Sequence, residues 1–177
     1  MVEVIAATLA GDDADRKKLL VTMFNQEGAS LVRLARIFTD DRNAAEDIVQ
    51  EAFIRLYRSA HRVSDDSKLP AYLRSIVLNL ARDHNRRGLL SLRHQQSEYL
   101  PPSEAPEEQI FRNESQAKVI ESLGELSPRQ RDCLVLRYFM DLSEREIAQT
   151  LGISANSVKT HTQRGMAALG TLLEDAR

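Results

Sequence analysis

The segment between Gln95 and Asn113 constrains the fold of this chain more than any other feature. It holds three of the five prolines of the chain, among serines and glutamates. Proline cannot continue a helix, and repulsion between neighbouring carboxylates opposes compaction. The segment therefore predicts a flexible linker between two small domains. The expected units are an N-terminal extension at 1–14, a first domain at 15–94, the linker at 95–113 and a second domain at 114–177.

The composition indicates that both domains are helical. Only 7 of the 177 residues are glycine, while Ala, Leu, Glu, Arg and Gln abound and no long β-branched alternation occurs. We therefore expect an all-α fold without a sheet. Each domain has roughly 65 to 80 residues, which suits a bundle of three or four helices. A hydrophobic fraction of 42% and a charged fraction of 28% are typical of a globular protein and exclude a disordered chain.

Three amphipathic helices are predicted in the first domain. Asn43 followed by Glu46 resembles an N-cap with its reciprocal partner, which indicates a helix start. Another helix opens at a proline, whose fixed φ suits a first helical position, and closes at a glycine. An earlier helix could break at Gly28. The expected helices are Lys17–Phe38, the helix capped by Asn43, and Pro70–Gly88.

The second domain carries three helix-start signals in succession. Ser127 precedes a proline at the first helical position, and Ser143 stands three residues before a glutamate, as in a capping box. Gly152 can take positive φ and leaves only a short turn before Ser154, which caps the next helix. Two helices joined by so short a turn predict a helix-turn-helix. A plain helical hairpin is the alternative.

The outward side of the last helix has residue types that read DNA. Gln and Asn pair with adenine, Arg and Lys with guanine, and Ser or Thr with a base or phosphate. Only Lys159 and Arg164 are positive there, so this domain alone is expected to bind DNA weakly and to need a larger assembly. A solvated helix face is the alternative. The outward residues are Asn156, Ser157, Lys159, Thr160, His161, Gln163 and Arg164.

The helix from Pro70 presents a second candidate surface for nucleic acid. The net charge of the chain is −2, so a basic surface has to be local. Polar and basic residues recur there at spacings of four, three and four, on one stripe opposite the apolar one. A solvated charged face would give the same pattern. The stripe consists of Ser75, Asn79, Arg82 and Arg86.

No pattern indicates an enzyme or a metal site. The four histidines are scattered, and neither an HExxH, a CxxC pair nor a glycine-rich phosphate loop occurs. Cys133 lies in an apolar run and is expected to be a core residue. No apolar run approaches the roughly 20 residues that span a membrane. We expect a cytoplasmic protein that is not an enzyme, with no cofactor, no metal, no small-molecule substrate and no membrane insertion.

Three stretches together resemble the extracytoplasmic-function sigma factors of the sigma-70 superfamily. These stretches are Asp47–Tyr57, Tyr72–Asp83, and the run from Leu126 through Leu142-Ser-Glu-Arg-Glu-Ile-Ala to Lys159. They are similar to sigma domain 2 followed by sigma domain 4. The resemblance covers about 20–90 and 117–173. Two matched domains in order are far more specific than either one alone.

The resemblance implies three sets of contacts and three partners. Asp47, Gln50, Glu51 and Phe53 fall on the motif that docks on core RNA polymerase, with Phe53 as core support. Ser75, Asn79, Arg82, Asp83 and Arg86 fall on the minus-ten DNA surface, and Ser64, Asp65 and Asp66 lie in the loop that holds a flipped base. Ser157, Lys159, Thr160, His161, Gln163 and Arg164 fall on the minus-thirty-five recognition helix. The implied partners are core RNA polymerase, promoter DNA and an anti-sigma factor.

Two alternatives and two departures from the family pattern accompany this interpretation. The second domain also resembles the helix-turn-helix of response-regulator and quorum-sensing activators, so a free-standing activator is the second hypothesis. Such a protein would need a receiver or ligand domain, and 15–94 lacks the strand-rich pattern of a receiver. The acidic surface at Asp47 and Glu51 could also be a plain solvated face. The loop Val63–Lys68 has no aromatic residue and the chain no Trp, which predicts stringent promoter choice.

Overall fold

The computed structural model describes residues 14–39, 41–59, 65–92 and 114–175, and all regular structure in these ranges is helical. The all-α prediction is confirmed. The predicted linker lies outside the described residues, as does almost all of the N-terminal extension. Side chains are described in 18–39, 41–59, 65–85 and 118–175.

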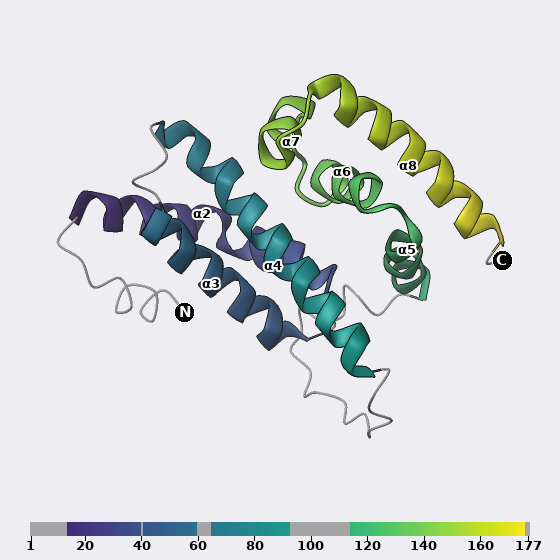
Figure 1. Ribbon diagram of the computed structural model, residues 1–177, viewed down its shortest axis with the longest axis horizontal. Helices are drawn as coiled ribbons and strands as arrows, with labels where there is room; N and C mark the ends of the chain where they lie inside the picture. The colour runs from purple at the N-terminus through teal and green to yellow at the C-terminus, as the bar shows by residue number, and fades with distance from the viewer. Residues whose placement is uncertain (1–13, 40, 60–64, 93–113, 176–177) are drawn as a thin grey trace.

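Three long helices form the first domain (Figure 1). They are α2 (Ala14–Arg36), α3 (Arg42–Ser59) and α4 (Leu69–Leu92), with a short 3-10 turn, η2 (Asp66–Lys68), before α4. Each helix packs on the other two, and their apolar stripes meet in one core. At its centre the Phe24 and Phe53 rings meet edge to face, with centroids 5.3 Å apart. The fully buried side chains include Leu20, Leu31, Leu34, Val49, Phe53, Leu56, Leu73 and Leu78.

Two details of the predicted helix ends are wrong: the N-cap of α3 and the end expected at Gly88. The N-cap of α3 is Asp41: its carboxylate accepts hydrogen bonds from the backbone N–H groups of Asn43 and Ala44, at 2.9 and 3.3 Å. Glu46 instead accepts a hydrogen bond from Arg42, one helical turn earlier. Helices α2 and α4 also run through Gly28 and Gly88. Glycine weakens a helix by about 1 kcal/mol relative to alanine but keeps its N–H, so it need not end one.

Four helices form the second domain: α5 (Glu114–Glu125), α6 (Pro128–Tyr138), α7 (Glu144–Leu151) and α8 (Ala155–Asp175). Helix α8 packs on α5, α6 and α7. Gly165 permits its close approach to α6, because a Cβ there would lie 3.2 Å from Leu134. The buried core includes Leu123, Cys133, Val135, Leu136, Ile147 and Val158.

The helix-turn-helix is confirmed in its turn and in two of its three caps. Gly152 ends α7 in the left-handed conformation with φ of 65°, and the Ser154 hydroxyl accepts a hydrogen bond from Ser157 N–H. Ser143 and Glu146 form a complete capping box at the start of α7. Ser127 precedes α6, with proline next, but its side chain makes no cap hydrogen bond.

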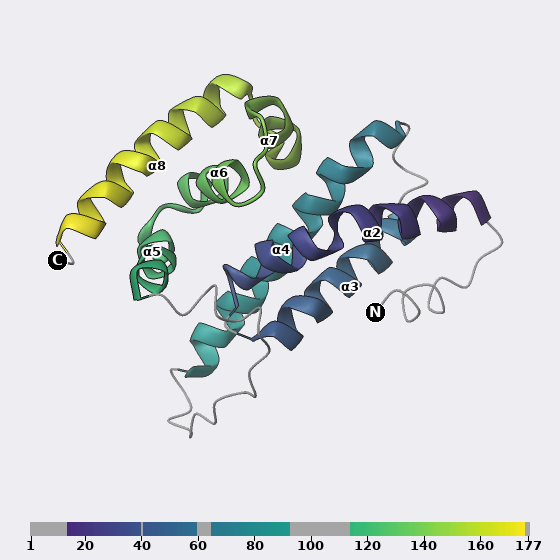
Figure 2. The ribbon, with the colours of Figure 1, turned by 180° about the vertical axis from the view of Figure 1, so that it is seen from behind.

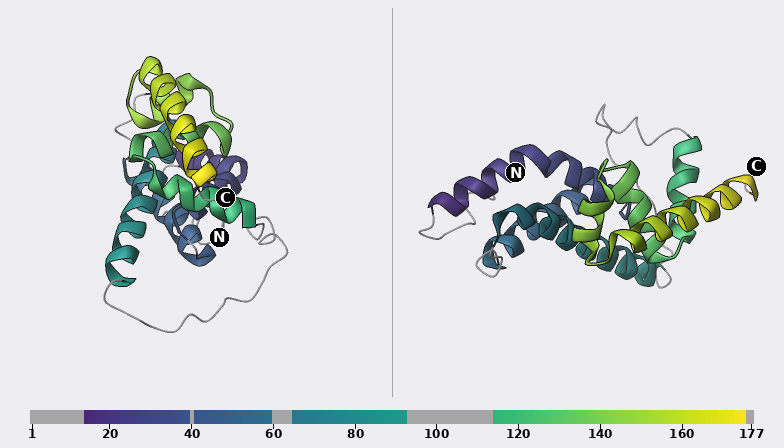
Figure 3. Two further views of the ribbon diagram at one scale, coloured as in Figure 1. Left: turned by 90° about the vertical axis from the view of Figure 1, so that its right-hand side faces the viewer. Right: turned by 90° about the horizontal axis from the view of Figure 1, so that it is seen from above.

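The two domains pack against each other through α4. Helix α4 has α2 and α3 on one side and α7 on the other. Figures 2 and 3 show the same arrangement from behind, from the side and from above. Helix α8 lies on the side of the second domain that is farther from α4 (Figures 1 and 2). This packing determines which of the expected functional surfaces are accessible.

Candidate nucleic-acid interface

The polar stripe of α4 faces a cavity between the two domains. Ser75, Asn79 and Arg82 line it from α4, as the spacing predicted. Ser75 is half-buried and donates a hydrogen bond to the Tyr72 carbonyl at 2.7 Å, whereas Asn79 is exposed to the cavity. Asp83 is exposed one residue farther along. Arg86 lies on α4, but its side chain is outside the described residues.

The second domain forms the opposite wall of this cavity. The wall includes Arg129 from α6, Gln149 and Thr150 from α7, and Gly152 from the turn. The cavity has a volume of about 390 Å³. Ser75, Asn79 and Arg82 thus lie together on one side of α4, and that side faces the second domain in this arrangement.

An ion pair joins the two domains at the end of the cavity. Arg82 Nη2 lies 2.9 Å from Asp132 Oδ2, and the Asp132 side chain is 0% exposed. The contact lacks hydrogen-bond geometry, and neither Asp132 oxygen has a hydrogen-bond partner. Burial raises the pKa of the Asp132 carboxyl, and the guanidinium groups of Arg82 and Arg131 offset only part of that rise. Desolvation therefore opposes the attraction between the charges.

Arg131 makes the next contact across the boundary. Its guanidinium carbon lies 5.0 Å from the centroid of the Phe38 ring, in the turn that follows α2. This is a cation–π geometry. Burial lowers the pKa of Arg131, and the positive charge of Arg82 lowers it further, against the opposing effect of Asp132. Asp132 thus lies between two guanidinium groups that repel each other.

The loop before α4 has a rigid acidic turn. Asp65 accepts hydrogen bonds from the Ser67 N–H at 3.0 Å and the Ser67 hydroxyl at 2.6 Å. These bonds lower the pKa of Asp65, and Lys68 lies 3.7 Å from its other oxygen. Asp66 is exposed in η2, and Ser64 lies outside the described residues.

The acidic surface expected to contact polymerase lies on α3. Asp47 is exposed, and Gln50 and Glu51 are half-buried. Glu51 accepts a hydrogen bond from Arg55 at 2.7 Å, one turn later. Phe53 is fully buried in the core of the domain, where it can support this surface from behind. Figure 1 shows α3 on the opposite side of α4 from α6 and α7.

Helix α8, the predicted recognition helix, keeps its outward side accessible. Lys159, Gln163 and Arg164 are exposed, while Ser157, Thr160 and His161 are half-buried. The Thr160 hydroxyl donates to the Asn156 carbonyl at 3.0 Å, which fixes its rotamer. The opposite side of the helix is anchored by the buried Val158 and Gly165.

Comparison with known proteins identifies the family. The family model "Sigma-70 region 2" matches residues 23–88, and "Sigma-70, region 4" matches residues 116–169. The RNA polymerase sigma-E factor of Streptomyces coelicolor is 33% identical over 141 residues, which cover 79% of this chain and 77% of that protein. The chain belongs to the sigma-70 family. The match at 23–88 also favours a sigma factor over a free-standing activator.

Other relatives place this sigma factor in the extracytoplasmic-function group. The ECF RNA polymerase sigma factor BldN of Streptomyces coelicolor is 27% identical over 180 residues, which cover 99% of this chain and 66% of BldN. The solved structure of CnrH with the cytosolic domain of CnrY matches with a TM-score of 0.68 at 25% identity. It covers 98% of this chain and 97% of CnrH. The sigma factor RpoE of Bartonella quintana, solved with the anti-sigma factor NepR, shares the fold with a TM-score of 0.61 at 20% identity, over 93% of this chain and 99% of that one.

Sigma factors are DNA-binding regulators of transcription. The described residues include no group of three or more His, Cys, Asp or Glu side chains that could hold a metal ion. In the same residues, no helix is both long and apolar enough to cross a membrane.

Proposed function

We propose that this sigma factor binds core RNA polymerase in the cytoplasm and directs it to promoters, without enzymatic activity of its own. The observation that carries the proposal is the presence of both sigma domains, in order, in one chain. One domain offers a polymerase-binding surface and a basic helix, and the other offers a recognition helix. The recognition helix alone would bind DNA weakly, because two or three phosphate contacts give low affinity at physiological salt.

Helix α3 would dock on polymerase through Asp47, Gln50 and Glu51. Asp47 is the most accessible of the three, and the Arg55 partner holds Glu51 in place. Carboxylates on a rigid helix suit a basic protein surface, where charge complementarity favours encounter and correct register. Phe53 would act indirectly, by fixing the position of α3 on the core.

Helix α4 and the loop before it would contact the minus-ten element. Asn79, Arg82, Asp83 and Arg86 would face the DNA, with Ser75 beside them. Ser64, Asp65 and Asp66 would border a pocket for a flipped base, and the bonds from Ser67 preorganise that turn. Extracting one base costs a few kcal/mol and exposes its pairing edge for recognition.

Helix α8 would read the minus-thirty-five element from the major groove. Gln163 and Arg164 carry the donors and acceptors that distinguish bases, and both are exposed. Lys159 would contact phosphate, with Ser157, Thr160 and His161 completing the surface. The cap at Ser154 orients the start of the helix, where base contacts occur in this motif.

An anti-sigma factor is a further proposed partner. CnrH, 25% identical to this chain, was solved in complex with the cytosolic domain of CnrY. The shared fold and the two small domains of this chain offer the same kind of surface to an inhibitor.

Reversing the charge of Asp47 tests the polymerase contact. We expect Asp47→Lys to weaken binding to purified core polymerase by about tenfold or more, because a like charge would then face the basic docking surface. Binding is measured by co-purification in the absence of DNA, and circular dichroism checks that helicity is unchanged. Asp175→Lys, an exposed change at the end of α8, is the matched control. Equal affinity of the two variants would refute the assignment of α3.

A further inference from the structure

The cavity between α4 and the second domain has a lining of unbalanced charge. Arg82 lines it from α4 and Arg129 lines it from α6, and its volume is about 390 Å³. Among the described residues that line this cavity, none is an aspartate or a glutamate. The net charge of the chain is −2, so this positive charge is local. Two arginines in one hollow without a carboxylate favour the binding of an anion.

The carboxylate of Asp132, next to the cavity, does not neutralise these arginines. Arg82 Nη2 lies 2.9 Å from Asp132 Oδ2. Burial raises the pKa of Asp132, and the charges of Arg82, Arg131 and Arg129 offset only part of that rise. Three guanidinium groups therefore act on one carboxylate, which leaves an excess of two positive charges. A small anion with two or more negative charges would offset this excess.

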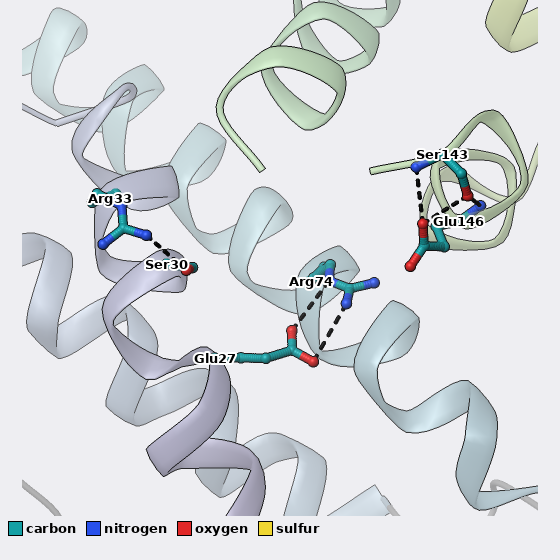
Figure 4. Close-up of polar contacts among 6 residues, drawn as sticks. All are labelled: Glu27, Ser30, Arg33, Arg74, Ser143 and Glu146. Atoms are coloured by element: carbon teal, nitrogen blue, oxygen red, sulfur yellow. Dashed lines mark hydrogen bonds and ion pairs between the residues drawn. The ribbon is translucent and has the colours of Figure 1, made fainter. Parts of the chain in front are cut away.

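Arg74 is also close to the second domain, but its charge is already balanced. Its guanidinium donates hydrogen bonds to Glu27 at 3.2 and 3.3 Å. Figure 4 shows this pair between α2 and α4, and the capping box of Ser143 and Glu146 at the start of α7. Hydrogen bonds from Ser143, and then the charge of Arg74, lower the pKa of Glu146. The excess positive charge therefore belongs to the arginines in and beside the cavity.

Both arginines of the lining keep hydrogen-bond donors for a ligand. A guanidinium has five N–H donors. Arg129 donates through Nη1 to the Leu151 carbonyl at 3.3 Å, and Arg82 faces Asp132 through Nη2. The Nε of Arg82 is buried without a hydrogen-bond partner. Phosphate oxygens match the fork of a guanidinium in both charge and geometry.

Uncharged polar groups of the lining can bind the remainder of such a molecule. Asn79 on α4 and Gln149 on α7 are exposed, and each amide both donates and accepts. Thr150 also lines the cavity, is only 4% exposed, and has a hydroxyl without a hydrogen-bond partner. Burying such a group is costly, so a molecule that supplies its partner gains affinity.

Unpartnered polar atoms gather at this boundary. Among the described residues, the buried side-chain nitrogen and oxygen atoms without a hydrogen-bond partner belong to Arg82, Arg131, Asp132 and Thr150. In folded proteins nearly all buried polar groups are hydrogen-bonded. A cluster of exceptions around one cavity therefore indicates a place that binds a polar molecule.

We propose that this cavity binds a small phosphate-bearing molecule, with the phosphate against Arg82 and Arg129. Asn79, Gln149 and Thr150 contact the remainder of the molecule. The volume of the cavity limits the ligand to a small one, and both a nucleotide and inorganic pyrophosphate have this chemistry. Such binding does not require that the chain bind polymerase or promoter DNA, so it is tested on the free protein.

Isothermal titration calorimetry of the free full-length chain tests the site. The titrants are sodium pyrophosphate, ATP and adenosine, without divalent cations and at about 0.15 M salt, which screens attraction to exposed charges. We expect ATP to bind more tightly than pyrophosphate, and adenosine, which lacks a phosphate, to bind more weakly than both. Equal affinity for ATP and pyrophosphate would overturn the contacts with the remainder of the molecule. Binding of neither phosphate compound would overturn the whole proposal.

Matched variants locate the site on the chain. Arg129→Gln should weaken ATP binding by about tenfold or more, the usual effect of losing a hydrogen bond to a charged group. Arg145→Gln removes the same charge from an exposed position on α7 and should have no effect. Thr150→Val should weaken binding several-fold, whereas Thr150→Ser, which retains the hydroxyl, should not. Circular dichroism checks that each variant is folded. Equal affinity of Arg129→Gln and Arg145→Gln would place the ligand elsewhere and overturn the assignment.

DNA is the other possible source of a phosphate in this cavity. A fluorescein-labelled, mixed-sequence single strand is therefore titrated into the same variants without polymerase. We expect Arg129→Gln and Arg145→Gln to bind the strand with equal affinity. A loss confined to Arg129→Gln, as large as its loss for ATP, would make the cavity a DNA contact and overturn the small-molecule assignment.

Discussion

The thiol of Cys133 lies in the core of the second domain, next to Asp132. Burial raises the pKa of this thiol to about 11, and the charge of Asp132 contributes to the rise. The thiolate is the reactive form of cysteine, so only about one thiol in a thousand is ionised at pH 8. Cys133 is therefore inert in the folded protein.

Iodoacetamide tests this property. At about pH 8 we expect Cys133 to be alkylated about a hundredfold more slowly in the folded chain than in urea, because unfolding restores an ordinary thiol pKa. Mass spectrometry of the intact chain follows the reaction. Similar alkylation rates with and without urea would show that the thiol is not buried and that its pKa is not raised.

The sequence predicts the environment of some single residues but not of others. Cys133 is recognisable as a core residue from its apolar neighbours, and Arg82 from its place on a polar stripe. Asp132 was missed, because a charged residue on an amphipathic helix normally indicates a solvated position. Its ion-pair partner, Arg82, belongs to the other domain, and no local signal reports such a contact. Two arginines within three residues of Asp132 are the only hint in the sequence.

At the scale of the helix, the capping box at Ser143 fixes the start of α7. The Ser143 hydroxyl accepts from Glu146 N–H at 3.3 Å, and Glu146 accepts from Ser143 N–H at 2.8 Å. Ser127 occupies the corresponding place before α6 without a side-chain hydrogen bond. The two serines are a matched pair that differ in capping.

Replacing each serine by alanine measures what the cap contributes. Ser143→Ala should lower the free energy of unfolding by about 1 kcal/mol, the usual cost of losing an N-cap bond. Ser127→Ala should change it much less. Urea unfolding followed by circular dichroism gives both values. Equal losses would mean that the hydrogen bonds at Ser143 contribute nothing specific.

The same cap predicts a pH dependence. Hydrogen bonds from Ser143 lower the pKa of Glu146 below its ordinary value of 4.5. A carboxyl with a lower pKa in the folded state adds stability above the unfolded pKa, and this contribution is lost as the pH falls through the folded value. The gap between the parent chain and Ser143→Ala should therefore narrow from neutral pH to about pH 3. A constant gap would contradict the role of the ionised carboxylate.

Helices were predicted better than their ends. Apolar spacing identified the helices, because burial of one face decides whether a helix forms. Gly152 was assigned correctly because a positive φ is required in that turn. The end expected at Gly88 does not occur, and α2 also runs through Gly28, since packing of long apolar stripes outweighs the cost of one glycine. Asn43 lost the capping role to Asp41, whose carboxylate reaches two N–H groups.

On the scale of the whole molecule, the sequence predicts two units but not how they meet. Each domain has its own local pattern of helices, and the proline-rich segment separates them. Helices α4 and α7 pack against each other. The sequence of each contacting surface resembles that of a solvated helix face, so it does not predict this packing. In Figure 1, α3 lies on the other side of α4 from α6 and α7. Ser75, Asn79 and Arg82 of α4 line a cavity whose other wall belongs to the second domain.

Transcription in vitro with purified core polymerase tests the function most directly. Templates from a genomic library are transcribed with and without the chain, and the 5′ ends of the transcripts are sequenced. We expect discrete start sites that appear only with the chain and share sequence elements about ten and thirty-five bases upstream, and Arg164→Ala should relax the second element alone. Start sites that are the same with and without the chain would contradict its assignment as the promoter-selecting subunit.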